Sequence, residues 1–183
     1  MRLFVSVDLP PSLSEPVAVV QDDLAEASGL NFVEPDQAHL TLKFLGDTEP
    51  DALEPLTTAI ETAVAEAGVE PFEATFGGLG VFPSPDYIRV VWLGVESGGD
   101  GFTRLFEALE KHTVELGFDA ESHDFTPHVT IARMEHASGK ELVQAALEEE
   151  YPVGSMTVDE VRLKESHLQS GGPVYETVER FPL

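Results

Sequence analysis

Two short segments of this chain carry side chains that together could perform acid–base chemistry. They are His39-Leu40-Thr41-Leu42 and His128-Val129-Thr130-Ile131, one His-apolar-Thr-apolar pattern that occurs twice, about half a chain length apart. Alternate side chains of a strand share a face, so each His and Thr would point one way and the apolar residues into the core. If the two strands lie side by side, two imidazoles and two hydroxyls meet in one cleft.

That set of groups suits reaction at a phosphorus atom. Two imidazoles with unperturbed pKa values near about 6.5 can supply one neutral base and one protonated acid on opposite sides of the reacting atom. Thr hydroxyls can donate hydrogen bonds to the phosphoryl oxygens, where charge develops. We expect no metal ion and no cofactor. The pattern alone leaves open the alternative that His39, Thr41, His128 and Thr130 are half-buried polar residues without a catalytic role.

Two cations follow these motifs closely. Lys43 has the strand parity of His39 and Thr41, so it can face the cleft, or it can be a solvated lysine at a strand end. Arg133 has the opposite parity to Thr130 and reaches the cleft only if the strand ends or bulges near Ala132. Base-stacking candidates at the cleft mouth are Phe82, Tyr87 and Phe125.

Hydrophobic periodicity predicts the elements that must position these groups. The predicted strands are 2–8, 39–45, 72–82, 88–95, 127–132, 153–165 and 174–181, and the predicted helices are 12–27, 51–67, 102–116 and 139–149. Because strands and helices are mixed without strict alternation, we expect an α+β fold with a largely antiparallel sheet.

Composition restricts the class of protein. The chain has 183 residues, 42% of them hydrophobic, which suits a single domain spanning 1–183. Its 34 acidic and 10 basic residues give a net charge of −24, which predicts a halophilic protein of a high-salt cytoplasm and excludes generic binding to phosphate backbones.

Without cysteine there is no disulfide, thiolate zinc site or cysteine nucleophile. We expect a cytoplasmic location and no membrane partner, since no apolar run reaches about 18 residues and no signal-peptide pattern opens the chain.

The chain resembles the two-histidine (2H) phosphoesterases, specifically the LigT-like RNA 2′,3′-cyclic phosphodiesterases, also described as 2′-5′ RNA ligases. The resemblance spans nearly the whole chain and rests on segments in the family's order: Met1 to Pro10, His39 to Gly46, Gly78 to Ser84, Val91 to Val95, Thr126 to Arg133, and Pro173 to Leu183. Phe32 departs from the pattern, since the family often has Trp before the first motif.

The resemblance implies a fold and a reaction. The fold would be bilobal, with two pseudo-symmetric lobes, one His-x-Thr motif per lobe and a cleft between them. Water would attack a terminal RNA 2′,3′-cyclic phosphate and leave a 2′-phosphate, with His39 as the acid and His128 as the base. Thr41 and Thr130 would hold the phosphoryl oxygens, and the family's motif has a phosphate-contacting arginine where this chain has Arg133.

Two alternatives remain at this point. The same site could join 2′,3′-cyclic phosphate and 5′-hydroxyl ends as a 2′-5′ RNA ligase, or the protein could bind RNA ends without catalysis. Water at about 55 M favours hydrolysis over attack by a scarce hydroxyl. The expected partner is an RNA end, and we expect a monomer with no obligate protein partner.

Overall fold

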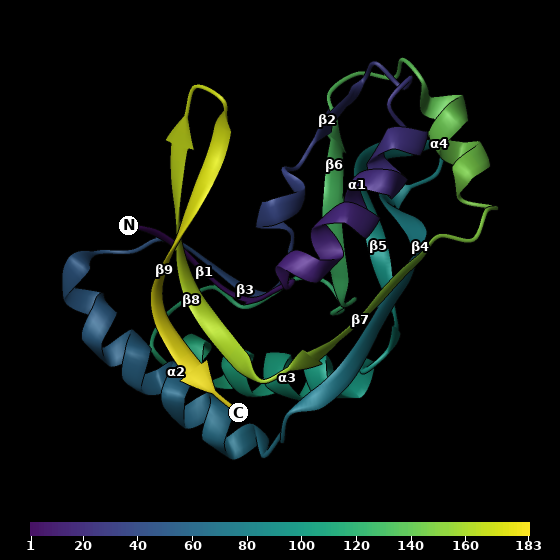
Figure 1. Ribbon diagram of the computed structural model, residues 1–183. Coiled ribbons are helices and arrows are strands. Elements are labelled where there is room, and N and C mark those ends of the chain that lie inside the picture. The colour runs from purple at the N-terminus through teal and green to yellow at the C-terminus, as the bar shows by residue number, and fades with distance from the viewer.

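Most strands mix buried residues with half-buried or exposed ones, whereas the first strand is buried continuously over residues 3–7. The computed structural model describes residues 1–183 (Figure 1). Its strands are β1 (Arg2–Asp8), β2 (Leu30–Phe32), β3 (His39–Asp47), β4 (Phe72–Ser84), β5 (Tyr87–Ser97), β6 (His128–Met134), β7 (Pro152–Val158), β8 (Glu160–Gln169) and β9 (Gly172–Pro182).

All strands join one curled antiparallel sheet in the order β7-β4-β5-β6-β3-β1-β8-β9, and the short β2 pairs with β6. The centre of this order lies between β6 and β3. We call β3, β1, β8 and β9 the first lobe, and β6, β5, β4 and β7 the second lobe. The predicted bilobal α+β fold with antiparallel sheet is confirmed.

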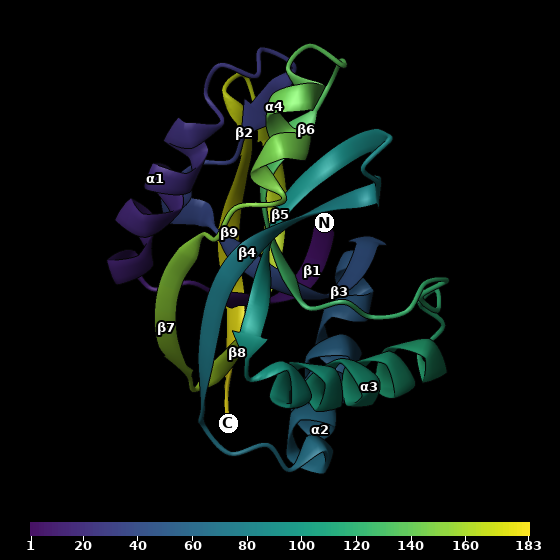
Figure 2. The same ribbon diagram turned by 90° about the vertical axis from the view of Figure 1, so that its right-hand side faces the viewer.

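Four helices cover the sheet: α1 (Ser14–Asp23), α2 (Leu53–Ala67), α3 (Gly99–Glu115) and α4 (Lys140–Ala146). Helices α2 and α3 pack against each other beneath the first lobe, and α1 and α4 lie beside the second (Figures 1 and 2). Short 3-10 turns at Pro11–Leu13, Pro35–Gln37 and Pro50–Ala52 each begin at a proline, whose fixed φ suits a first helical position. The helices and the sheet enclose one core cluster of 35 buried residues.

The structure departs from the sequence prediction at one functionally important point. The predicted strand 153–165 is two strands, which separate at Asp159. Strand β7 pairs with β4 in the second lobe, whereas β8 pairs with β1 in the first, so the chain passes from one lobe to the other at this residue. No glycine or proline marks the break. In addition, none of the helices is long and apolar enough to cross a membrane.

Candidate active site

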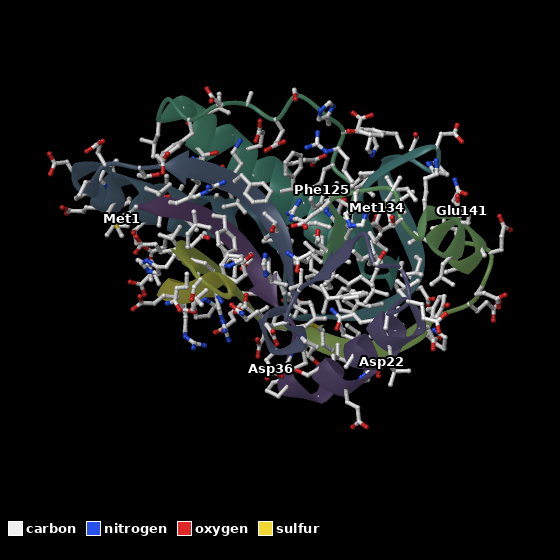
Figure 3. All side chains as sticks on the ribbon, turned by 90° about the horizontal axis from the view of Figure 1, so that it is seen from above. Met1, Asp22, Asp36, Phe125, Met134 and Glu141 are labelled. Carbon is white, nitrogen blue, oxygen red and sulfur yellow. The ribbon has the colours of Figure 1, made fainter.

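The two His-x-Thr motifs lie beside each other at the centre of the sheet. Leu40 of β3 pairs with Val129 of β6, and the two strands are antiparallel. The apolar residues of both motifs are buried in the core, whereas the four polar residues are half-buried and therefore face the other side: His39, Thr41, His128 and Thr130. Figure 3 looks down onto the molecule from this direction, with Met1 on the side of the first lobe and Met134 at the end of β6. The structure thus brings all four residues to one face.

Both imidazoles are held in the same way. The Nδ1 atom of His39 lies 2.9 Å from the carbonyl oxygen of Gln37, and Nδ1 of His128 lies 2.6 Å from that of Thr126. A carbonyl oxygen only accepts hydrogen bonds, so Nδ1 carries the proton in each neutral ring and donates it. The Nε2 atom of each ring is left to accept a proton, or to donate one when the ring is protonated.

Aromatic rings surround His128. The Phe82 ring meets it edge-on at a centroid distance of 5.0 Å, and the Trp92 ring lies at 5.7 Å. A side chain at Gly80 would collide with the Trp92 indole, so the glycine is what allows this ring to lie against the strand. The setting of His128 is therefore largely apolar.

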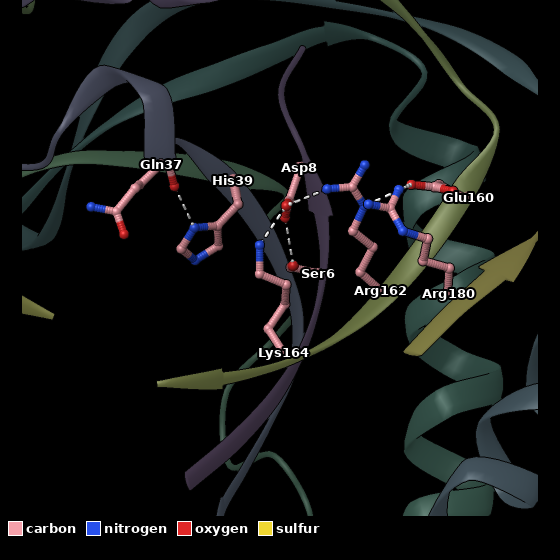
Figure 4. Close-up of polar contacts among 8 residues, drawn as sticks. All are labelled: Ser6, Asp8, Gln37, His39, Glu160, Arg162, Lys164 and Arg180. Carbon is pink, nitrogen blue, oxygen red and sulfur yellow. Dashed lines mark hydrogen bonds and ion pairs between the residues drawn. The ribbon is translucent and has the colours of Figure 1, made fainter. Parts of the chain in front are cut away.

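His39 has aromatic neighbours and charged ones. Phe4 and Tyr175 lie at centroid distances of 5.1 and 5.0 Å from its ring. Asp8 of β1 is its cross-strand partner, and the Asp8 carboxylate accepts hydrogen bonds from Lys164 at 2.5 Å and Arg162 at 2.9 Å (Figure 4). The two histidines thus share a geometry but differ in electrostatic setting.

Burial lowers the pKa of both histidines. It is the largest influence on each ring, because desolvation disfavours the charged imidazolium. The hydrogen bonds to the backbone carbonyls act in the opposite direction in both. The Asp8 carboxylate also raises the pKa of His39, more strongly than Lys164 lowers it, and His128 has no such carboxylate.

An extra residue in each central strand determines which side chains beyond the motif face the cleft. The ladder shifts after Thr41 in β3, and after Thr130 in β6. In both strands the two residues that follow the motif threonine are buried: Leu42 and Lys43 in one, Ile131 and Ala132 in the other. The next residues, Phe44 and Arg133, are exposed. A bulge of this kind reverses the alternation of faces.

The expectation that Lys43 faces the cleft is wrong for this reason. Its side chain is fully buried, and Nζ donates to the Glu110 carboxylate of α3 at 2.7 Å and to the Asp119 carbonyl at 2.6 Å. The bulge moves Lys43 to the helix side of the sheet, at the position that Ala132 holds in β6. Lys43 is thus part of the packing between β3 and α3.

Arg133 reaches the cleft face through the corresponding bulge in β6. Burial, the largest influence, lowers the pKa of His39 and His128 and raises the pKa of Tyr175, and the positive charge of Arg133 acts to lower all three. The exposure of Arg133 and its influence on both imidazoles are consistent with a position on their face of the sheet. Arg133 has no carboxylate partner in the chain, and its donors are open to an anion.

Of the three base-stacking candidates, one lies beside an active-site histidine and two do not. Phe82 contacts His128, whereas Phe125 stacks on Phe106 at 4.4 Å and Tyr87 is exposed at the β4–β5 turn.

The sequence did not predict that Asp8, Lys164 and Tyr175 lie beside His39. Strand alternation predicts which face of its own strand Asp8 or Lys164 occupies. It does not predict that the two side chains meet, because the pairing of β1 with β8 joins segments more than 150 residues apart. No group of three His, Asp or Glu side chains could hold a metal ion.

Comparison with known proteins places this geometry in a family. Residues 9–169 match the model of the 2′-5′ RNA ligase superfamily. Proteins named RNA 2′,3′-cyclic phosphodiesterase are similar to the chain over nearly the full length of both: one from Methanothermobacter thermautotrophicus is 40% identical, covering 100% of this chain and 99% of the relative, and one from Archaeoglobus fulgidus is 36% identical, covering 99% of each.

Solved structures of similar proteins have the same fold as this chain. TT0787 of Thermus thermophilus superposes with a TM-score of 0.81 at 30% identity, covering 100% of this chain and 98% of its own. Escherichia coli LigT in complex with 3′-AMP also gives 0.81, at 24% identity and with 100% and 97% covered, and shows the same fold. The chain therefore belongs to the 2′-5′ RNA ligase superfamily, the two-histidine phosphoesterases.

Proposed function

We propose that this protein is an RNA 2′,3′-cyclic phosphodiesterase that hydrolyses a terminal 2′,3′-cyclic phosphate to a 2′-phosphate. The observation that carries the proposal is the pair of imidazoles on adjacent central strands, each fixed through Nδ1 and each with Nε2 free. The full-length similarity to proteins of that name supports the same reaction.

The proposed reaction is an in-line displacement at phosphorus. Nε2 of neutral His128 takes a proton from water as the water oxygen attacks. The P–O3′ bond breaks, and Nε2 of protonated His39 gives its proton to O3′. The product carries a 2′-phosphate and a 3′-hydroxyl. Burial lowers the pKa of both rings, and the Asp8 carboxylate, which has no counterpart beside His128, partly offsets this for His39 and so supports this assignment.

Charge on the phosphoryl group needs donors on the same face. We assign Thr41, Thr130 and Arg133 to the non-bridging oxygens, since their half-buried or exposed side chains share the face of the two imidazoles. Lys43 is not part of this set, because Glu110 and the Asp119 carbonyl hold its ammonium. The chain's own groups supply the proton transfers and the anion contacts, so we propose a reaction without metal ion or cofactor.

The product end tests the proposal against ligation. A 2′,3′-cyclic oligonucleotide is incubated with the protein, with and without an excess of RNA bearing a 5′-hydroxyl. We expect a 2′-phosphate as the main product in both reactions. A joined 2′-5′ product as the main species would instead identify a ligase, and binding without turnover would identify an RNA-end binder.

We also propose that the chain works as a monomeric single domain, built by internal duplication, in a high-salt cytoplasm. The matching burial of β3 and β6 supports the duplication, and the presence of both histidines in one chain supports a monomer without an obligate protein partner. The net charge of −24 supports the high-salt setting. Sedimentation in molar KCl tests the monomer, and a dimer there would contradict it.

A further inference from the structure

A row of charged side chains runs outward from His39 across the first lobe. Asp8 of β1 is the cross-strand partner of His39, and it binds Lys164 and Arg162 of β8. Arg162 in turn binds Glu160, which also binds Arg180 of β9. Figure 4 shows these residues in one line from the active-site imidazole to the edge strand.

Two guanidinium groups at the outer end of this row share one carboxylate. Arg162 Nε and Arg180 Nη1 donate to the same oxygen of Glu160, at 2.6 and 2.9 Å. Arg162 also uses Nη1, on Asp8, so its Nη2 keeps no partner, and Arg180 keeps both Nε and Nη2 free. Side-chain exposures of 25% and 56% leave these donors open to solvent.

The row is richer in cations than the chain as a whole, with the Glu179 carboxylate also beside Arg180, whose backbone N–H donates to it. The row contains three cations, Arg162, Lys164 and Arg180, and two carboxylates, Asp8 and Glu160, in a protein with 34 acidic and only 10 basic residues. The Arg180 side chain is more than half exposed, and an ion pair at such a side chain contributes at most about 1 kcal/mol to folding, so stability explains little of its position. Paired guanidiniums with free donors match the oxygens of a phosphate.

The direction of the reaction places the RNA strand over this row. In an in-line displacement, the attacking water and the departing O3′ lie on opposite sides of the phosphorus. With His128 beside the water and His39 beside O3′, the ribose lies on the side of the first lobe. Strands are spaced by about 4.8 Å, so β8 and β9 lie roughly 10 and 14 Å across the sheet from His39. The next phosphates of a bound strand can reach that region.

We infer that Arg162 and Arg180 form a subsite for the RNA phosphodiester on the 5′ side of the terminal cyclic phosphate. The inference rests on the proposed function and refines it, because it makes an RNA strand a better substrate than a cyclic mononucleotide. Glu160 holds the two guanidiniums in place before the strand binds, which lowers the ordering cost of the contact.

Two substrates and two variants test the subsite. One substrate is a short oligoadenylate with a 2′,3′-cyclic end, and the other is 2′,3′-cyclic AMP, which has the cyclic phosphate but no internucleotide phosphodiester on its 5′ side. The variants are Arg180→Ala and Arg162→Ala, and Arg180→Ala is decisive because Arg180 does not contact Asp8. Lys111→Ala is the control, since it removes an equal charge from an exposed ion pair between α3 and α2.

For Arg180→Ala we expect the KM of the oligonucleotide to rise about tenfold and the ratio of kcat/KM between the two substrates to fall by the same factor. The slope of log affinity against log salt should become shallower by about 0.7. The control should change neither quantity. An unchanged KM for the oligonucleotide, or an equal loss on both substrates, would overturn the subsite. A wild-type protein that hydrolyses neither substrate would overturn the proposed function itself.

Discussion

The two imidazoles have one geometry and two electrostatic settings. In each motif, the carbonyl two residues before the histidine holds Nδ1, so the local backbone orients both rings in the same way. The neighbours then differ: Phe82 and Trp92 beside His128, Asp8 and Lys164 beside His39. Equivalent rings can thus take different protonation states, which acid–base catalysis at one phosphorus requires.

Loss of either imidazole should remove one proton transfer. We expect His39→Gln and His128→Gln each to lower kcat by about 10²–10⁴, and the double variant to lose much less than the product of the two factors. Thr41→Val should cost less, about 1.5–3 kcal/mol, as expected for one hydrogen bond to a charged group. Steady-state kinetics on a cyclic-phosphate oligonucleotide measures all of these. Near-normal turnover in either histidine variant would refute the paired mechanism.

The lowered pKa values of the histidines predict an acidic optimum. The active form needs one protonated and one neutral imidazole, and both pKa values lie below the usual value of about 6.5. The bell-shaped profile of kcat/KM should therefore have its maximum below about pH 6.5. A maximum above pH 7.5 would contradict the burial of the two rings.

The same shifts link stability to pH. A histidine whose pKa is lower in the folded state than in the unfolded state contributes stability above the unfolded value, and that contribution is lost as pH falls through the folded value. The free energy of unfolding should therefore decrease below about pH 6.5. His39→Gln combined with His128→Gln should make that decrease shallower, as chemical denaturation at several pH values would show.

At the scale of the element, one extra residue in a strand decides which cation faces the cleft. The bulges in β3 and β6 bury Lys43 and Ala132 and expose Phe44 and Arg133. The surroundings of this buried position differ between the two strands: Glu110 of α3 pairs with Lys43, whereas Ala132 packs within the core.

Lys43→Met should therefore affect folding rather than substrate binding. Removing one partner of a buried ion pair leaves the other uncompensated, and we expect a loss of about 3 kcal/mol of stability. Lys111→Met, at an exposed ion pair with Glu66, should cost under about 1 kcal/mol. Denaturant unfolding measures both. A higher KM with unchanged stability in Lys43→Met would mean that the lysine faces the cleft after all.

Much of this arrangement could be predicted from local patterns. The alternation around His39 and His128 predicts the strands and the shared face, and the helix predicted over 51–67 ends as expected, before Gly68 with φ of 59°. The predictions that failed concern features that depend on contacts between strands far apart in the sequence. The bulge that turns Lys43 away depends on pairing between β1 and β3, and the position of Lys164 depends on a β1–β8 contact that joins the two ends of the chain. Neither pairing leaves a periodic signal in a single strand.

At the scale of the whole molecule, the acidic surface should determine the response to salt. A net charge of −24 destabilises the compact state through self-repulsion, and the Debye length shrinks from about 30 Å at 0.01 M to 3 Å at 1 M. We expect the thermal midpoint and the activity both to rise from dilute buffer into molar KCl. A midpoint that is flat or falls would contradict the halophilic proposal and leave the catalytic proposal intact.

The central claim is that two histidines direct water to the phosphorus of a cyclic phosphate and release O3′. The most direct test is hydrolysis of a 2′,3′-cyclic oligonucleotide in ¹⁸O-labelled water with EDTA, with mass analysis of the product end. We expect a 2′-phosphate that carries one ¹⁸O atom, formed at the rate observed without EDTA. A 3′-phosphate, or activity that EDTA removes and magnesium or zinc restores, would contradict it.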